Sequence, residues 1–308
     1  MKEIKERIDK LIHQLKLRKI DFYLISTSDE FLNEYPPNYN MRLKWLTNFS
    51  GSNGIALISR SNKYFFTDGR YILQSKKQLI KDFKIFDSAK VNIFSFILNY
   101  LKKKQIMLDM RCFSTNFVKT LISKAKENRN VIVNDKKKLF DNLWKDRPKE
   151  LDKKFFMLEE RFTGQSFNEK VNQIRPKDKS ILVISSPESV CWLLNIRGYD
   201  VENTPLIFSR LILTKQKIEL FVNKNKVPNE FINKYKKVLI FDIDKFETTI
   251  SKYLNKNILV DKQISYFFYE LLNNNNNVKL IDDPCIKRKS LKNSVEIKCS
   301  KQAHLNDG

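Results

Sequence analysis

The sequence predicts an α/β protein built from two consecutive domains. Short segments rich in β-branched and aromatic residues alternate with segments whose apolar residues recur at helical spacing, which is typical of a layered α/β fold. The chain has 308 residues, more than one compact domain usually needs. A charged, proline-bearing stretch at 143–154 interrupts the alternation, and the same order of elements then begins again. We therefore place one domain at 1–145 and a second at 155–285.

The first half begins with a helical segment in which charged residues alternate with isoleucine and leucine. Ser61-Asn62 lies between two strand-like runs and predicts a tight hairpin turn. Ser114 or Thr115 is suited to cap a helix that follows it. The predicted helices of this half are 1–21, 71–79, 91–104 and 114–128, and the predicted strands are 21–27, 54–60, 63–68, 105–110 and 130–135.

The second half repeats this alternation of strands and helices over a similar length, which favours an internal duplication of the fold. Pro187 suits the first turn of a helix, and Asn293 with Glu296 suits a capped start of the last one. That last helix carries a narrow apolar stripe, so we expect it to fray unless it docks on another surface. The predicted strands are 180–186, 205–214, 217–223, 238–244, 258–261 and 277–283, and the predicted helices are 187–195, 246–255, 263–274 and 293–308.

The charge balance invites a nucleic-acid interpretation that the residue pattern does not favour. The chain holds 58 lysine and arginine residues against 35 aspartate and glutamate residues, a formal net charge of +23. The excess is mostly lysine and is scattered, whereas surfaces built for phosphates cluster arginine and lysine on one face. Solvated lysine faces explain the charge better, so we do not expect nucleic-acid binding despite the high net charge.

The residue types that build metal and catalytic centres are sparse in this sequence. The two histidines, His13 and His304, have no ligand-like neighbour at helical spacing, and no Ser-His-Asp or Cys-His arrangement is possible without a central histidine. The four cysteines are far apart, and buried free thiols explain them better than zinc or disulfides. No apolar run approaches the length of a membrane span and no signal peptide is evident, so we expect a cytoplasmic protein.

A glycine-rich stretch and a following corner are the most informative local features. Gly51 and Gly54 predict tight backbone geometry before a strand, because the chain has only 6 glycines. In the corner after 63–68, we expect Asp68 to cap the helix that begins near Arg70, with Gly69 allowing the turn. Arg70 can pair with a nearby carboxylate or face a domain interface. A structural corner is the better interpretation than a ligand contact.

Several motifs resemble a known enzyme family in collinear order. RLKWLTNFSGSNGIALIS at 42–59 and FFTDGRYILQSKKQL at 65–79 resemble the N-terminal domain of three-domain Xaa-Pro aminopeptidases, the aminopeptidase P branch of the creatinase family (metallopeptidase family M24). The segments at 143–149, 162–171 and 190–209 are similar to the interdomain segment and the second creatinase-N-like domain. The resemblance implies two ribonuclease H-like domains, each a mixed β-sheet flanked by helices, and a C-terminal lead-in helix at 286–308.

The resemblance also implies what this chain lacks. Family members hold two metal ions, usually manganese, with two Asp, one His and two Glu of a third, pita-bread domain, and the sequence stops at the threshold of that domain. We therefore expect no catalytic residue, metal ligand or cofactor in the chain. It should be a truncated, non-catalytic portion of a hydrolase that releases an N-terminal residue before proline, shaping the active-site entrance and supporting assembly. The family also implies a homodimer and proline-containing peptides as partners, and no membrane.

Two questions stay open at the level of sequence. Arg42 and Arg197, together with Arg70, are candidates for residues that face the substrate entrance or an interface, because arginine's planar fork suits carboxylates. An intradomain salt bridge explains Arg42 or Arg197 equally well. The alternative function is an independent peptide- or nucleic-acid-binding module derived from the enzyme.

Overall fold

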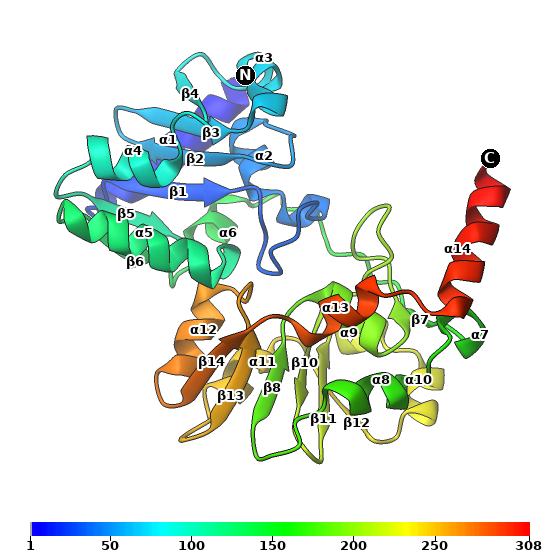
Figure 1. Ribbon diagram of the computed structural model, residues 1–308. Helices are drawn as coiled ribbons and strands as arrows, with labels where there is room; N and C mark the ends of the chain where they lie inside the picture. The colour runs from blue at the N-terminus through cyan, green and yellow to red at the C-terminus, as the bar shows by residue number, and fades with distance from the viewer. Residues whose placement is uncertain (1) are drawn as a thin grey trace. The chain divides into compact units, whose positions relative to one another are not determined.

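The computed structural model describes residues 2–308 and divides the chain into two compact units. The first unit is 1–149 together with residues 265–267, and the second is the remainder of 150–308. Each unit contains a six-stranded mixed sheet with helices packed on it (Figure 1). The predicted α/β class with two mixed sheets is therefore confirmed. The expectation that 286–308 begins a further domain stays a prediction.

The first sheet has the strand order β4-β3-β2-β1-β5-β6. Strand β2 pairs antiparallel with both β1 and β3, while the pairs β3–β4, β1–β5 and β5–β6 are parallel. The predicted hairpin turn joins β2 to β3. The strands are β1 (Phe22–Ser26), β2 (Ile55–Ser59), β3 (Lys63–Thr67), β4 (Phe83–Asp87), β5 (Gln105–Leu108) and β6 (Val131–Asn134).

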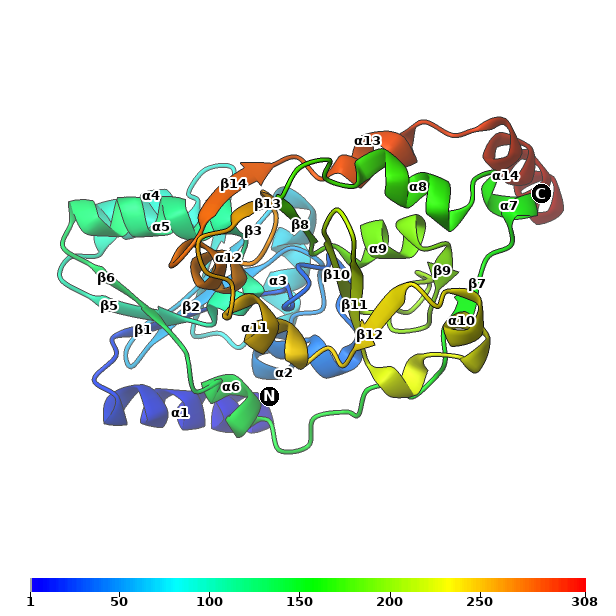
Figure 2. The ribbon, with the colours of Figure 1, turned by 90° about the horizontal axis from the view of Figure 1, so that it is seen from below.

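Helices cover both faces of the first sheet. Figure 2 shows α1 beside α6 on one side and α4 beside α5 on the other. Helix α1 carries Ile4, Ile8, Leu11 and Leu15 on one stripe, each about one turn after the residue before it. All four are buried in the main core of the unit. The helices are α1 (Lys2–Leu17), α2 (Arg42–Thr47), α3 (Ile72–Gln78), α4 (Ile93–Tyr100), α5 (Thr115–Glu127) and α6 (Leu139–Leu143).

The second sheet repeats the first in order and direction. Its order is β12-β11-β10-β8-β13-β14, and β10 pairs antiparallel with both β8 and β11 while the other pairs are parallel. The predicted duplication of the fold is thus confirmed at the level of topology. The strands are β8 (Ile181–Ile184), β10 (Ser209–Leu213), β11 (Ile218–Val222), β12 (Val238–Phe241), β13 (Asn257–Asp261) and β14 (Asn277–Ile281), and a separate pair is β7 (Phe156–Met157) with β9 (Ile196–Arg197).

A chain of aromatic contacts links the second sheet to the helices α11 and α12. Phe221 of β11 packs on Phe246 with ring centroids 5.3 Å apart, and Phe246 packs on Phe268 at 5.1 Å. Helix α9 packs against α8 and α13. The helices are α7 (Glu160–Thr163), α8 (Phe167–Ile174), α9 (Pro187–Leu193), α10 (Asn229–Lys234), α11 (Lys245–Ile250), α12 (Tyr266–Asn273), α13 (Pro284–Ser290) and α14 (Ser294–Asp307).

The last helix begins as the sequence predicts. The side chain of Asn293 accepts a hydrogen bond from the backbone N–H of Glu296, and the Glu296 side chain accepts one from the Asn293 N–H, which completes a capping box. No residue of α14 is buried, and Ile297 and Leu305 are exposed. Helix α14 touches α7 of its own unit near Arg161, where Cys299 Sγ lies 3.9 Å from the Arg161 carbonyl oxygen.

Candidate functional site

The corner after β3 is a capped turn. The side chain of Asp68 accepts a hydrogen bond from the Arg70 N–H, and a 3₁₀ turn at Gly69–Tyr71 leads into α3. Arg70 also donates to Asp68 from Nε at 3.0 Å and from a terminal nitrogen at 2.8 Å, and these side-chain bonds lower the pKa of Asp68 to about 2. Arg70 thus pairs with the neighbouring carboxylate. Gly69 has ordinary backbone angles and open space around it, so the turn does not require glycine there, contrary to our expectation.

The two preceding glycines are required by close packing. A Cβ on Gly51 would lie 2.7 Å from Cδ1 of Tyr71, and a Cβ on Gly54 would lie 2.7 Å from Cζ of Phe65. The ring of Phe49 blocks both positions as well. Neither glycine has a positive φ. Close approach of aromatic rings to the backbone, and not backbone conformation, therefore explains glycine at both sites.

A pocket of the first unit lies beside these rings. Its volume is about 170 Å³, and it is bounded by the loop between β1 and α2, by α2 and the residues just after it, and by the start of α3. Tyr71 and Met41, which are partly exposed, contribute apolar surface, and Phe49, which is 1% exposed, lies buried behind it. Glu34 and Lys44 also line the pocket. Sequence reasoning did not find this pocket, because its wall combines residues from positions 27 to 74.

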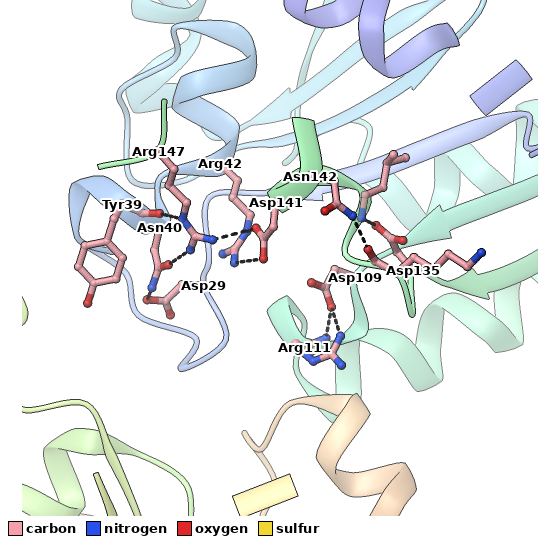
Figure 3. A network of polar contacts seen from close by, with 12 residues as sticks. Asp29, Tyr39, Asn40, Arg42, Asp109, Arg111, Asp135, Asp141, Asn142 and Arg147 are labelled. Atoms are coloured by element: carbon pink, nitrogen blue, oxygen red, sulfur yellow. Dashed lines mark hydrogen bonds and ion pairs between the residues drawn. The ribbon is translucent and has the colours of Figure 1, made fainter. Parts of the chain in front are cut away.

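A buried polar network holds the loop between β1 and α2 (Figure 3). Arg42, which is 6% exposed, donates from Nε to Asp141 at 3.0 Å, and Arg147 contacts the same carboxylate at 3.1 Å. Arg147 also donates to the Tyr39 carbonyl oxygen at 2.6 Å and to Oδ1 of Asn40 at 2.7 Å. Arg42 therefore forms an ion pair within its own unit, which is one of the two interpretations that the sequence left open for it.

Asp29 is the inner end of this network. Its carboxylate is fully buried and accepts hydrogen bonds from the backbone N–H groups of Phe31 and Asn33 and from the amides of Asn33 and Asn40. Burial raises the pKa of Asp29, while the donors of Asn33 and Phe31 oppose that rise. The network contains no nucleophile beside a base, and its geometry serves to order the loop.

Arg197 occupies a different environment in the second unit. It donates to the carbonyl oxygens of Cys191 at 3.0 Å and Ile196 at 2.8 Å, and burial lowers its pKa. These acceptors are backbone groups of its own unit. Its role at an entrance or interface stays a prediction, and so does that of Arg70.

Two lysines of the second unit are buried, which we did not predict from the sequence. Lys226 contacts the carboxylates of Asp200, at 2.5 Å, and Glu150. Lys170 donates to the Trp192 carbonyl oxygen at 3.2 Å and to Oδ1 of Asn195 at 2.7 Å, and its ammonium lies 4.5 Å from the centroid of the Trp192 ring. Nothing in the local sequence separates these lysines from the many solvated ones.

Lys170 should make the stability of the second unit depend on alkaline pH. Burial lowers the pKa of Lys170 from 10.5 to about 8. The unfolded chain therefore binds more protons than the folded one between those values, so the free energy of unfolding should rise as pH increases from about 8 to 10.5. We expect a rise of about 2 kcal/mol between pH 7.5 and 9.5. Urea titrations followed by hydrogen exchange of β8 and β10 measure it.

The matched controls for this experiment are Lys170→Met and Lys179→Met. The first should remove the alkaline rise. The second changes an exposed lysine of the same unit and should keep it. An unchanged pH dependence in Lys170→Met would show that another group is responsible.

Within residues 2–308, no group of three or more His, Cys, Asp or Glu side chains is placed to hold a metal ion. All four cysteines are free thiols, as predicted, and Cys112, Cys191 and Cys285 are buried. Cys299 is partly exposed, so the prediction that it is buried was wrong. No helix in the described part of the chain has both the length and the apolar composition of a membrane span.

Comparison with known proteins links both units to one domain family. Two family models, both described as Creatinase/Prolidase N-terminal domain, match residues 7–139 and 146–296. The chain is 26% identical over 320 residues to a probable Xaa-Pro aminopeptidase P of Laccaria bicolor, covering 98% of this chain and 50% of the relative. It is 28% identical over 326 residues to Xaa-Pro aminopeptidase 1 of Dictyostelium discoideum, covering 99% and 51%. The chain thus spans about half the length of these curated relatives.

A solved structure has a similar fold over nearly the whole length of this chain. X-prolyl aminopeptidase of Caenorhabditis elegans, described as a cytosolic enzyme with a di-nuclear active site, superimposes with a TM-score of 0.92 at 23% identity. The match covers 99% of this chain and 54% of that protein. At this identity the likeness establishes the fold.

Proposed function

The chain belongs to the creatinase/prolidase N-terminal domain family, and on this basis we propose that it is the non-catalytic N-terminal portion of an Xaa-Pro aminopeptidase. The observation that carries the proposal is the extent of the matches, which cover 98% and 99% of this chain but only 50% and 51% of two aminopeptidase relatives. In this proposal the two metal ions of the family, usually manganese, bind outside the residues of this chain. Hydrolysis of the bond before proline then requires the other half of such an enzyme.

We propose that the two units shape the entrance of the peptide site and support assembly into a homodimer. The C. elegans protein is described as cytosolic, which supports a cytoplasmic location for this chain as well. Arg197 and Arg70 are the candidates for entrance or interface residues. The guanidinium of Arg70 is the better placed for contact with a partner, because its side chain is 67% exposed while the Arg197 side chain bonds backbone oxygens.

A chimera tests this role. Residues 1–308 are joined to the C-terminal half of the Dictyostelium relative, and hydrolysis of an Xaa-Pro peptide is compared with that of the C-terminal half alone. We expect the chimera to show a kcat/KM about tenfold higher or more, because positioning of the peptide contributes to catalysis. Equal activity and equal oligomeric state of the two proteins would contradict the proposed role.

Single substitutions in the chimera then address the arginines. Arg70→Ala and Arg197→Ala should raise KM or shift the monomer–dimer equilibrium. Arg129→Ala, at an exposed arginine of the first unit, is the matched control and should change neither. An arginine whose replacement leaves both quantities unchanged has no entrance or interface role.

A further inference from the structure

The pocket beside Phe49 has the size and surface to take one apolar side chain. Its volume of about 170 Å³ is close to the roughly 150 Å³ of an engineered apolar cavity that binds benzene. Phe49 and Tyr71 meet edge to face with centroids 5.8 Å apart, and Met41 and Pro36 add further apolar surface. Gly51 keeps this surface open, since a Cβ there would push into both rings.

The pocket also carries one charge of each sign. Glu34 and Lys44 both line it, both are exposed, and neither forms an ion pair with another side chain in the part of the chain that the structure describes. Glu34 accepts a long hydrogen bond, 3.4 Å, from Oγ of Ser52. The guanidinium of Arg70 is bonded to both carboxylate oxygens of Asp68, and Glu34 acts on it only through space, by raising the pKa of Arg70.

The wall of the pocket is held in place before any ligand arrives. Glu34 and Met41 belong to the loop between β1 and α2, which Asp29 and Arg147 fasten through Asn40. On the opposite side, Ser50 accepts hydrogen bonds from the amides of Gln74 and Gln78. A ligand would therefore meet an ordered site, which lowers the entropic cost of binding.

We propose that this pocket binds a free hydrophobic α-amino acid as its zwitterion. The side chain lies against Tyr71 and Met41, the ammonium group contacts Glu34, and the carboxylate contacts Lys44. An apolar body with one cation and one anion matches the three kinds of surface that the pocket offers. The site lies wholly within the first unit, so it does not depend on the proposed aminopeptidase role.

Isothermal titration of the full chain with L-leucine and L-phenylalanine tests the proposal. Phenylalaninamide, which lacks the carboxylate and stands for the N-terminus of a peptide, and N-acetylphenylalanine, which lacks the ammonium, are the comparison ligands. We expect saturable binding of both free amino acids below about 10 mM and a loss of about tenfold or more for each comparison ligand.

Matched variants locate the site. Glu34→Gln and Lys44→Met should each weaken phenylalanine binding about tenfold, because each removes a charge-assisted contact. Glu6→Gln and Lys126→Met change exposed charges on α1 and α5 and should leave the affinity unchanged. All four positions are exposed, so circular dichroism should show the same fold throughout.

Three results would overturn the proposal. The first is no binding of either amino acid at about 10 mM. The second is equal affinity for phenylalanine and phenylalaninamide, which would assign the site to a peptide N-terminus. The third is unchanged affinity in folded Glu34→Gln and Lys44→Met proteins.

Discussion

Replacing Lys226 with methionine should destabilise the second unit by about 3–5 kcal/mol, because removal of one partner leaves a buried charge uncompensated. The Lys226 side chain is 1% exposed and that of Asp200 is 2% exposed. Asp200 also accepts a hydrogen bond from the Phe208 N–H at 2.7 Å. Burial already raises the pKa of Asp200, and the Lys226 contact opposes that rise. Without the ammonium, the carboxylate must either stay charged in an apolar site or take up a proton.

Hydrogen exchange of β10 and β11 measures this loss in the unit concerned. Asp200→Asn in the Lys226→Met background should restore part of the stability, since the amide oxygen can still accept from Phe208 without carrying a charge. Glu150→Gln should cost much less, because the Glu150 side chain is 40% exposed. Equal losses for Lys226→Met and Glu150→Gln would show that burial of the ion pair is not the cause.

Replacing Asp29 with alanine should destabilise the first unit by about 3 kcal/mol and open the loop between β1 and α2. The donors of Phe31, Asn33 and Asn40 would lose their acceptor while buried, and each unsatisfied donor costs about 1–3 kcal/mol before relaxation. Asp29→Asn should also destabilise the unit, because its new amide would face the amides of Asn33 and Asn40. Asp9→Ala, at an exposed site on α1, is the control and should change stability by less than about 0.5 kcal/mol.

Tryptophan fluorescence separates this unit from the other. Trp45 and Trp144 lie in the first unit and Trp192 in the second, so a Trp192→Phe background makes the signal specific. Urea unfolding in that background gives the change in stability. A midpoint shift no larger than that of Asp9→Ala would contradict the role assigned to Asp29.

The strands were predictable where the sequence alternates turn residues with short apolar runs. The hairpin at Ser61-Asn62 and the helix after Ser114 are examples, because the observed bounds of their elements lie within one residue of the predicted ones. Strand β4 was not predicted, because it is short and contains a lysine, so its residues show no clear alternation of apolar and polar side chains. The strand predicted at 205–214 begins only at Ser209, because the Phe208 N–H bonds the Asp200 side chain and not a neighbouring strand.

The polar sites were not predictable, because they join distant residues. Arg42 and Asp141 are 99 positions apart, and Lys170 and Asn195 are 25 apart. The composition predicted exposed lysines and not buried ones, since lysines scattered along a chain are usually solvated. Asp68 is the contrast, because its partner lies two residues away and its role follows from local turn chemistry.

The most direct test of the proposed function is an Xaa-Pro peptide assay on the purified chain of residues 1–308, with and without added Mn²⁺. We expect no hydrolysis above background under either condition, because a metal ion can generate a hydroxide nucleophile at neutral pH only when it is bound, and we place its ligands outside this chain. A parallel sample carrying Arg70→Ala and Arg197→Ala separates a trace contaminant from the chain itself. Metal-dependent turnover that copurifies with the chain and falls in the double variant would contradict the account.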